Sequence, residues 1–470
     1  MSTAQDRGSL VSLGEFTGAT LLTDPIDLVP YRRDTSAVAP GRPDAVVRPE
    51  SAEAVAEVLR RANRERIPVY ARGGATMYAG GVNPRAGGIV LDLGGLDRIL
   101  DIDLDRGIVV CEPGVRFGAL LAALGPHGQT IGVVPSTAPT ATVGGALSAH
   151  ALGTGSPQFQ SFGDQVAGVE VVLADGQRVK TGSAASPQAG YFQRYCIGPD
   201  LTGLFLGADG TLGVVVALAL WLHPLPPHRQ TNCYGFADAQ GVQRCIQEIQ
   251  RRELVGNIWY AGAYEAATVK TRIAQVFPDK AEGPLPQFAL AVDYRGEADR
   301  VREDEERIAE IAARSGGAPF PDFNEAYFRK LRTDEIYWYS FAGFFAISRC
   351  AILMSSVPTD RLCAFLEVMN RQRRNYPQYP LGAAVVMCRR GLHGGALAFY
   401  DEATQWAGAV AAMEECAEAL VEAGCVPYKT GKVWVRQVQG FTAYWELLRR
   451  IKRELDPHGI LSPGDLGLGG

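Results

Sequence analysis

The first part of the chain alternates between short apolar runs and longer stretches with apolar residues at helical spacing. Helical spacing occurs at 54–64 and 117–124, and strand-like runs occur at 68–70, 89–93, 107–111 and 169–174. Gly and Pro residues separate these elements. Short strands that alternate with helices favour an α/β arrangement from about residue 44 to 222, after a turn-rich leader over 1–40.

A proline cluster at 223–228, with the sequence HPLPPH, gives the clearest boundary along the chain. Proline fixes φ and lacks an N–H group, so neither a helix nor a central strand continues through it. Helical patterns then occur at 239–252, 297–315, 359–371 and 406–423, between β-rich runs at 288–294, 351–357 and 383–387.

The end of the chain carries a basic amphipathic pattern at 441–455, followed by Asp456-Pro457-His458-Gly459. Such a sequence is typical of a helix with a defined stop. The patterns therefore predict three parts: residues 1–223, residues 224–426 and a C-terminal segment, 427–470.

Composition restricts the function classes. The chain has 470 residues, 47% of them hydrophobic and 21% charged, with a net charge of −5, which is typical of a soluble protein of two or three domains. It has no basic tract for nucleic acid and no apolar run of the ~18 residues that a membrane span needs. Nine cysteines without a C-x-x-C spacing argue against a structural metal. Residues 1–10 do not resemble a secretory signal, so we expect a cytoplasmic protein.

The most informative stretch is the glycine-rich sequence YARGGATMYAGG at 70–81. It lies between two predicted strands, where Gly73, Gly74, Gly80 and Gly81 allow the backbone to approach a ligand and turn its N–H groups toward a phosphate. A tight surface turn would use the same glycines.

Six further segments follow this loop, and their order narrows the choice. They are VCEPGV at 110–115, the Ser/Thr/Gly-rich stretch 135–146, SFGD at 161–164, VVLADG at 171–176, the stretch 200–215, and LDPHGILSPG at 455–464. Together with the glycine loop, this ordered set resembles the flavoprotein family of vanillyl-alcohol oxidase and p-cresol methylhydroxylase.

The resemblance implies an α+β protein. A two-subdomain FAD-binding fold of the p-cresol methylhydroxylase (PCMH) type would precede an α/β substrate or cap domain with an antiparallel sheet and flanking helices. FAD would lie between the two subdomains, with backbone N–H groups and hydroxyls around its pyrophosphate. The implied cofactor-binding residues are Arg72, Gly73, Gly74, Ala75, Thr76, Pro135, Ser136, Thr137, Thr140, Thr142, Gly144, Gly145, Gly163, Asp164, Gly210, Gly213, Val214 and Val215.

Family members often bond the flavin covalently through a histidine in the first loop, where this chain has Ala75. Others use a His or Tyr on a cap strand that corresponds to 348–353, which contains neither. Cys350 on that strand is typical of a small buried residue. The pattern at His393, followed by two glycines, is typical of an exposed turn. We therefore expect non-covalent FAD.

The resemblance also implies a substrate site. The segment 425–431 is similar to the phenol-oxidising branch, in which two tyrosines and an arginine bind a phenolate; the corresponding residues here are Tyr78, Tyr428 and Lys429. Hydrogen bonds and positive charge favour the ionised phenol. A hydride then leaves the para benzylic carbon for the flavin and a quinone methide forms. Lysine keeps the charge of arginine but loses its planar fork.

Two other functions remain open. Ser136 stands where the phenol branch usually has an aspartate, and this loop is closer to the 2-hydroxy-acid dehydrogenases of the glycolate or D-lactate type; Lys429 and Arg349 would then bind a carboxylate. A flavin-binding subunit for assembly or electron transfer is a third alternative. In the phenol hypothesis the partners are a small aromatic substrate and a cytochrome or other electron acceptor, with a homodimer as an open alternative.

Two aromatic groups in the cap, Trp259-Tyr260 and Tyr337-Trp338-Tyr339, are either part of an aromatic pocket or ordinary core and surface residues.

Overall fold

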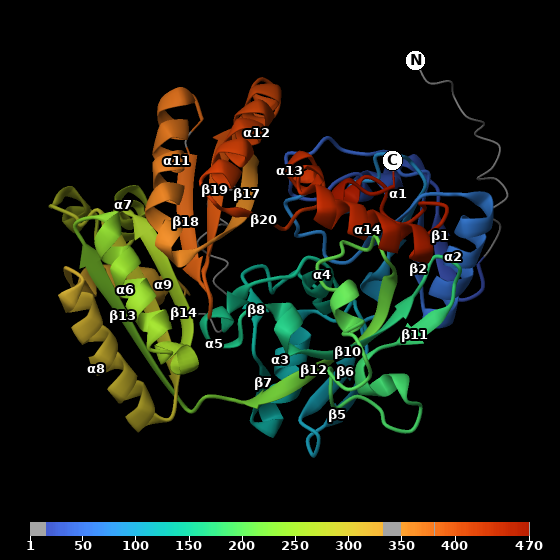
Figure 1. The fold of residues 1–470 in the computed structure, drawn as a ribbon, viewed down its shortest axis with the longest axis horizontal. Coiled ribbons are helices and arrows are strands. Elements are labelled where there is room, and N and C mark those ends of the chain that lie inside the picture. The colour runs from blue at the N-terminus through green and yellow to red at the C-terminus, as the bar shows by residue number, and fades with distance from the viewer. Residues whose placement is uncertain (1–15, 332–348, 380, 470) are drawn as a thin grey trace.

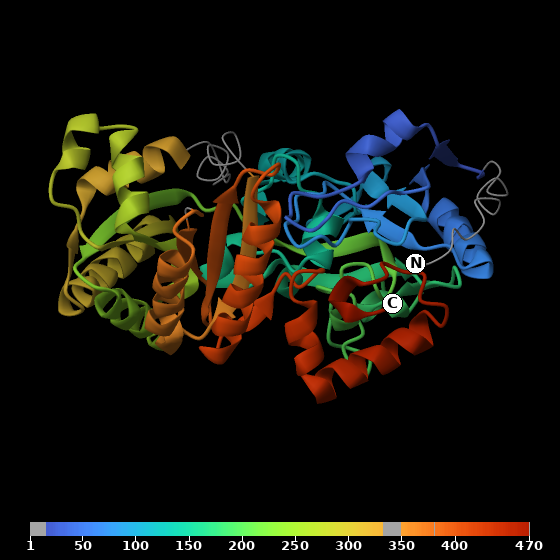
Figure 2. The ribbon, with the colours of Figure 1, turned by 90° about the horizontal axis from the view of Figure 1, so that it is seen from above.

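Two lobes make up the molecule in the computed structural model, which describes residues 16–331, 349–379 and 381–469 (Figure 1). Strand β12 (Val214–Pro224) belongs to the first lobe, and β13 (His228–Phe236) belongs to the second. The proline cluster therefore lies at the crossing between the lobes. Seen from above, the first and last coloured segments of the chain, dark blue and red, both lie on the first lobe (Figure 2).

The first lobe begins with a small four-stranded sheet in the order β1-β2-β4-β3. Its strands are β1 (Ala19–Leu22), β2 (Ala45–Pro49), β3 (Val69–Arg72) and β4 (Ile89–Asp92), and β2, β4 and β3 run parallel. Helix α2 (Ala52–Glu65) packs Val55 and Leu59 against this sheet. The Ser51 hydroxyl accepts from the Ala54 N–H and caps the start of α2.

A second, antiparallel sheet completes the first lobe in the order β11-β10-β12-β6-β5, with β7 paired to the far end of β12. The remaining strands of this lobe are β5 (Ile99–Asp103), β6 (Ile108–Cys111), β7 (Gln129–Ile131), β8 (Val134–Pro135), β9 (Gly153–Thr154), β10 (Val166–Val172) and β11 (Arg178–Lys180). Its helices are α1 (Pro25–Leu28), α3 (Phe117–Leu124), α4 (Val143–Ser148) and α5 (Ser156–Phe159). Every residue of β10 is buried, because this strand is central and is covered on both faces.

The second lobe is built on one eight-stranded antiparallel sheet in the order β16-β13-β15-β14-β18-β19-β17-β20. Its other strands are β14 (Ile258–Glu265), β15 (Phe288–Gly296), β16 (Gly317–Pro319), β17 (Arg349–Val357), β18 (Leu381–Met387), β19 (Leu392–Tyr400) and β20 (Val426–Tyr428). Its helices are α6 (Ala239–Arg251), α7 (Ala266–Ala274), α8 (Ala298–Arg314), α9 (Pro321–Leu331), α11 (Leu362–Asn375) and α12 (Trp406–Glu422). We call this lobe the cap.

The chain returns from the cap to the first lobe after β20. Helices α13 (Val435–Gly440) and α14 (Thr442–Leu455) follow, and Leu448 and Ile451 of α14 pack on the core of the first lobe. Leu461 then forms a parallel bridge with Val69 on β3. Among the described residues, no helix is long and apolar enough to cross a membrane.

The predicted elements agree closely with this architecture. The helix at 117–124 has the predicted bounds, and the helix at 54–64 is α2 with three further residues. The β-rich runs at 288–294, 351–357 and 383–387 all lie in the cap sheet, whose antiparallel order was also predicted.

Candidate functional site

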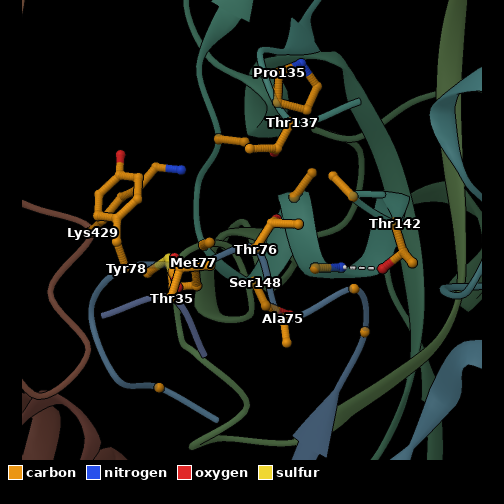
Figure 3. Close-up of a pocket in the computed structure, with 18 of the residues that line it drawn as sticks. Thr35, Ala75, Thr76, Met77, Tyr78, Pro135, Thr137, Thr142, Ser148 and Lys429 are labelled. Carbon is orange, nitrogen blue, oxygen red and sulfur yellow. Dashed lines mark hydrogen bonds between the residues drawn. The ribbon is translucent and has the colours of Figure 1, made fainter. Parts of the chain in front are cut away.

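A cavity of about 640 Å³ lies between the loops of the first lobe and one face of the cap sheet. From the first lobe it is lined by residues of three loops, at 71–78, 135–154 and 209–215. From the cap it is lined by residues of β14, β17, β18 and β19, and by Tyr428 and Lys429 at the end of β20. Figure 3 shows the loop residues surrounding the pocket, with Tyr78 and Lys429 at one end.

The first two loops pack closely because both are rich in glycine. A Cβ on Gly73 would lie 2.3 Å from Thr142 Oγ1, and one on Gly74 would lie 2.1 Å from the carbonyl oxygen of Thr140. Thr142 is fixed there because its Oγ1 accepts from the Gly145 N–H at 3.2 Å, the bond drawn in Figure 3. A Cβ on Gly144 would lie 2.4 Å from the Pro113 side chain. Glycine is therefore required for these loops to meet.

Unpaired backbone donors occur in the first of these loops, which lines the cavity. Across the described chain, none of the backbone N–H groups of residues 73–78 donates to a protein oxygen. Five of these residues are half-buried and Gly74 is exposed, so their six unpaired N–H groups are available to a ligand with several acceptor oxygens. A pyrophosphate fits this chemistry.

Most of the predicted cofactor-binding residues line this cavity. They are Arg72, Gly73, Gly74, Ala75, Thr76, Pro135, Ser136, Thr137, Thr140, Thr142, Gly144, Gly145, Gly210, Gly213, Val214 and Val215. Gly210 has φ of +74°, a backbone conformation that disfavours other residues. A Cβ on Gly213 would lie 2.4 Å from Val171 Cγ1, so this third loop is also packed too tightly for a side chain.

Gly163 and Asp164 are not among the lining residues of this cavity, and a role for this pair in binding the cofactor stays a prediction. Asp164 is exposed and accepts from the backbone N–H of Ser161 at 3.0 Å, so it caps a short 3₁₀ helix. The Gly163 carbonyl accepts from Arg194, and a Cβ on Gly163 would lie 3.2 Å from the His150 ring. This segment supports His150 from behind instead of lining the cavity.

The three residues predicted for the substrate site lie together in the cavity. The Lys429 Nζ is 5.2 Å from the centre of the Tyr78 ring and 5.8 Å from that of Tyr428. Within the described parts of the chain, this ammonium group has no hydrogen-bonding or ion-pair partner. Burial lowers the pKa of Lys429 to about 8, while the charge of Asp209 opposes that shift. Burial also raises the pKa of Tyr78 and of Tyr428, so both hydroxyls stay protonated.

Tyr428 and Tyr78 differ in their hydroxyl contacts. The Tyr428 hydroxyl donates to the carbonyl oxygen of His150 at 2.7 Å. His150 has φ of +49°, a left-handed backbone conformation that is unusual for a histidine. Over the described residues, the hydroxyl of Tyr78 has no hydrogen-bonding partner. Tyr78 is thus the more available donor of the two.

Sequence reasoning missed Asp209, whose carboxylate lines the cavity. Burial raises its pKa to about 7, against the opposing effects of the Gly431 N–H and of Lys432 and Lys429. The Gly431 N–H donates to Asp209 Oδ2 at 3.1 Å, which ties the third loop to the chain just after Lys429. Asp209 lies within the stretch 200–215 that carried the resemblance, but a single acidic residue among glycines gave no sign of its burial.

Lys432 joins Asp209 to two more buried carboxylates. Its Nζ lies 2.7 Å from Asp465 Oδ1 and donates to the Gly80 carbonyl oxygen at 3.1 Å. Burial raises the pKa of Asp465 and of Asp34, and Lys432 opposes both shifts. The result is a buried charge cluster that holds the C-terminal segment against the first loop.

The prediction that His393 lies in an exposed turn is wrong. His393 lies on β19, is 8% exposed and lines the cavity, so it is not an exposed turn residue. Its ring meets that of Tyr428 edge-on at 4.4 Å between centres. Burial, together with the charges of His150 and Lys429, lowers its pKa to about 3, so it stays neutral. The glycines after it are needed for packing, because a Cβ on Gly394 would lie 2.6 Å from the Phe365 ring.

Other predicted residues divide between cavity and core. Tyr260 and Tyr264 line the cavity, whereas Trp259 is fully buried in the cap. Cys350 is 2% exposed, is absent from the cavity wall, and has a pKa raised by burial to about 12. Arg349 lines the cavity and pairs with Glu402 at 3.4 Å. The group at 337–339 lies outside the described residues.

Comparison with known proteins agrees with this geometry. A family model described as an FAD binding domain matches residues 43–182, and one described as the C-terminal domain of FAD linked oxidases matches residues 225–466. An uncharacterized FAD-linked oxidoreductase of Mycobacterium tuberculosis is 27% identical, with 95% of this chain and 96% of that protein covered. The mitochondrial D-lactate dehydrogenase [cytochrome] of Arabidopsis thaliana is 25% identical, covering 90% of this chain and 73% of that protein.

Two solved structures resemble the whole chain. The 4-ethylphenol oxidase from Gulosibacter chungangensis, in a complex with isoeugenol, gives a TM-score of 0.80 at 20% identity, covering 95% of this chain and 94% of that one. A substrate-bound p-cresol methylhydroxylase gives 0.79 at 18% identity, with the same shares covered. The predicted PCMH-type fold and the predicted cofactor, FAD, are both confirmed.

Proposed function

The chain belongs to the FAD-linked oxidases, and from this premise we propose that it oxidises a para-substituted phenol or a related aromatic alcohol. The observation that carries this proposal is the ammonium of the half-buried Lys429, which faces the cavity between two tyrosine rings without a described protein acceptor and whose pKa is lowered by desolvation. A buried cation is costly unless it is paired, so this position favours an anionic ligand.

A phenolate meets the requirements of this end of the cavity. The Tyr78 hydroxyl donates to the phenolate oxygen while Lys429 supplies positive charge, and both favour the ionised form. Tyr428 becomes a second donor when it leaves the His150 carbonyl. The neutral His393 ring, edge-on to Tyr428, keeps that side chain in place.

The reaction then follows from the charge on the phenolate. Bound FAD supplies the acceptor for a hydride. The para benzylic C–H bond breaks, the hydride leaves with both electrons, and the phenolate becomes a neutral quinone methide. Water adds to this intermediate, or a neighbouring C–H proton is lost. The hydrogen bonds of Tyr78 and Tyr428 position the ring, while apolar residues such as Ile352 and Val386 line the rest of the cavity.

A 2-hydroxy acid is the second candidate substrate, favoured by the similarity to a D-lactate dehydrogenase. Arg349 and Lys429 both line the cavity and would bind the carboxylate. Arg349 pairs with Glu402, a carboxylate that it shares with Arg33, so this arginine is already engaged with the protein.

Anaerobic mixing with substrate decides between the two. We expect 4-alkylphenols to bleach the flavin absorbance and D-2-hydroxy acids to leave it unchanged. Bleaching by D-lactate or glycolate alone would contradict the phenol proposal. Whichever substrate reduces the flavin, either oxygen or a cytochrome, as named for the D-lactate dehydrogenase, takes the electrons. Reoxidation of the reduced protein with each acceptor identifies which one it is.

We also expect FAD to be held without a covalent bond. Ala75 cannot bond it, and the Cys350 thiol is buried away from the cavity. Acid precipitation should leave the yellow colour in the supernatant; a yellow pellet would contradict this expectation and direct attention to His393.

A further inference from the structure

Three tyrosine hydroxyls meet behind the cap wall of the cavity, at the part of the wall that Tyr260 and Tyr264 line and away from Lys429. Tyr260 and Tyr264 lie four residues apart on β14, so their side chains share one face, and Tyr327 reaches them from α9. The hydroxyls of Tyr260 and Tyr264 are hydrogen-bonded, as are those of Tyr264 and Tyr327, and the Tyr327 hydroxyl donates to that of Tyr260 at 3.2 Å. We call these three residues the hydroxyl triad.

The local sequence is built to bring two of these hydroxyls together. Gly262 lies between Tyr260 and Tyr264 on the same face of β14. A Cβ at this position would lie 2.5 Å from the Tyr260 hydroxyl and 2.7 Å from that of Tyr264. The two rings therefore lean toward each other over a glycine, and any side chain there would separate them.

The register of the sheet links the triad to the predicted phenolate site. Tyr264 lies opposite Ala384, Ala384 opposite Gly395, Gly395 opposite Met354, and Met354 opposite Tyr428. All five residues line the cavity. Four steps between neighbouring strands span about 19 Å, which is much longer than one phenol ring. The small residues Ala384 and Gly395 form the middle of this row.

The chemistry of the triad suits a ligand oxygen. Each hydroxyl has one proton and two lone pairs, so a ring of three uses one donor and one acceptor of each, and a bound oxygen can take over one of the donated protons. Burial raises the pKa of all three hydroxyls, and they remain donors. The positive charge of Arg272 lowers the pKa of Tyr260 and Tyr264, and the same charge favours a negatively charged ligand beside them.

We propose that the hydroxyl triad is a second polar subsite, which binds an oxygen-bearing group, a hydroxyl or a carboxylate, at the end of the substrate remote from the phenolate. The inference rests on the proposed function, because it assumes that a phenol is anchored at Lys429. It makes the substrate an extended para-substituted phenol with oxygen functions at both ends. Tyr260 and Tyr264 would then determine specificity.

The experiment compares probes of equal length on the FAD-loaded protein. The probes are a 4-alkylphenol, its ω-hydroxy analogue and its ω-carboxy analogue, and the Kd of each is taken from the concentration dependence of the rate of flavin reduction in anaerobic stopped-flow mixing. We expect one oxygen-ended probe to bind about tenfold more tightly than the alkyl probe, the value of one hydrogen bond to a buried group. The tighter of the two oxygen-ended probes shows whether the subsite prefers a hydroxyl or a carboxylate.

Tyr264→Phe and Tyr260→Phe should each reduce this ratio of Kd values toward one. The matched control is Tyr294→Phe, which removes a buried cap hydroxyl outside the cavity wall and should keep the wild-type ratio. A ratio near one in the wild type, or a tenfold ratio that survives in both variants, would overturn the subsite alone. If 4-methylphenol and the longer probes all fail to bind, the proposed function falls and the subsite falls with it.

Discussion

The two walls of the cavity are made in different ways. The wall of the first lobe consists of backbone and glycines, where Gly73, Gly74 and Gly144 leave no space for a Cβ. The cap wall consists of polar side chains, such as the half-buried Lys429 and the buried His393 and Tyr264. In the proposed function, the backbone wall, which we call the cradle, binds the cofactor, and the side chains of the cap wall bind the substrate.

The largest expected effect tests the cradle. In Gly74→Ala the new Cβ would meet the Thr140 carbonyl oxygen at 2.1 Å, so the two loops must separate. We expect FAD affinity to fall by about 100-fold or more, since overpacking against backbone costs up to about 3 kcal/mol. The flavin-to-protein absorbance ratio and an FAD titration measure this loss.

Gly118→Ala is the matched control for that variant. Gly118 lies in α3, and a Cβ there has nothing within 4 Å. Alanine favours a helix more than glycine does, so FAD content should stay normal and the melting temperature should hold or rise. Full FAD binding by Gly74→Ala would mean that the glycines only shape a turn.

The second prediction tests the cap wall. Lys429→Met removes the buried charge but keeps an apolar side chain of similar length. We expect the rate of flavin reduction by a 4-alkylphenol to fall about 20-fold, the value of a hydrogen bond to a charged group, while FAD stays bound. Stopped-flow absorbance gives the rate. Loss of FAD together with the rate would show that Lys429 serves the cofactor and not the substrate.

The contrast between the walls also explains what the sequence could predict. A backbone cradle depends on glycines at fixed positions, so Gly73, Gly74 and Gly144 are visible in the sequence without a structure. The order of seven segments then predicts the fold and the cofactor. For Gly163 and Asp164 the sequence is less informative, because a capped 3₁₀ turn uses the same residue types as a ligand loop.

The cap wall depends on residues that only the fold brings together. Asp209 accepts a hydrogen bond from Gly431, which lies more than 200 positions away and two residues after Lys429. No local sequence pattern around Asp209 indicates this contact. Two glycines after a histidine usually indicate a turn, whereas Gly394 and Gly395 leave space for Phe365 and Met354 inside a sheet. The partners of such residues come from other strands, and one sequence does not contain that information.

The third prediction concerns the hydrogen bonds over the predicted phenolate site. Tyr428→Phe should slow reduction by a 4-alkylphenol about tenfold, roughly one charge-assisted hydrogen bond. The hydroxyl now binds the His150 carbonyl, so the variant also frees that group. Tyr379→Phe, which removes a cap hydroxyl outside the cavity wall, is the control. An unchanged rate in Tyr428→Phe would leave Tyr78 and Lys429 as the only predicted partners of the phenolate.

The smallest expected effect is a shift in pH dependence that joins the two walls through Asp209. Lys429 has a pKa of about 8, so its charge is present below that pH and is lost above it. A fluorinated phenol that is ionised throughout should therefore bind less tightly as the pH rises above 8, as read from flavin absorbance.

Asp209→Asn should move this decrease to lower pH, because the negative charge of Asp209 holds the pKa of Lys429 up. The amide oxygen can still accept from the Gly431 N–H, so the loop should keep its place. Lys429→Arg should move the decrease in the opposite direction, beyond the range measured, since a guanidinium stays charged. Two shifts of opposite sign would establish that the charge facing the cavity belongs to Lys429 and that Asp209, from the cofactor-binding lobe, controls it. If the wild type, Asp209→Asn and Lys429→Arg gave the same dependence of phenol binding on pH, Asp209 in the first lobe would have no influence on the charge that contacts the substrate.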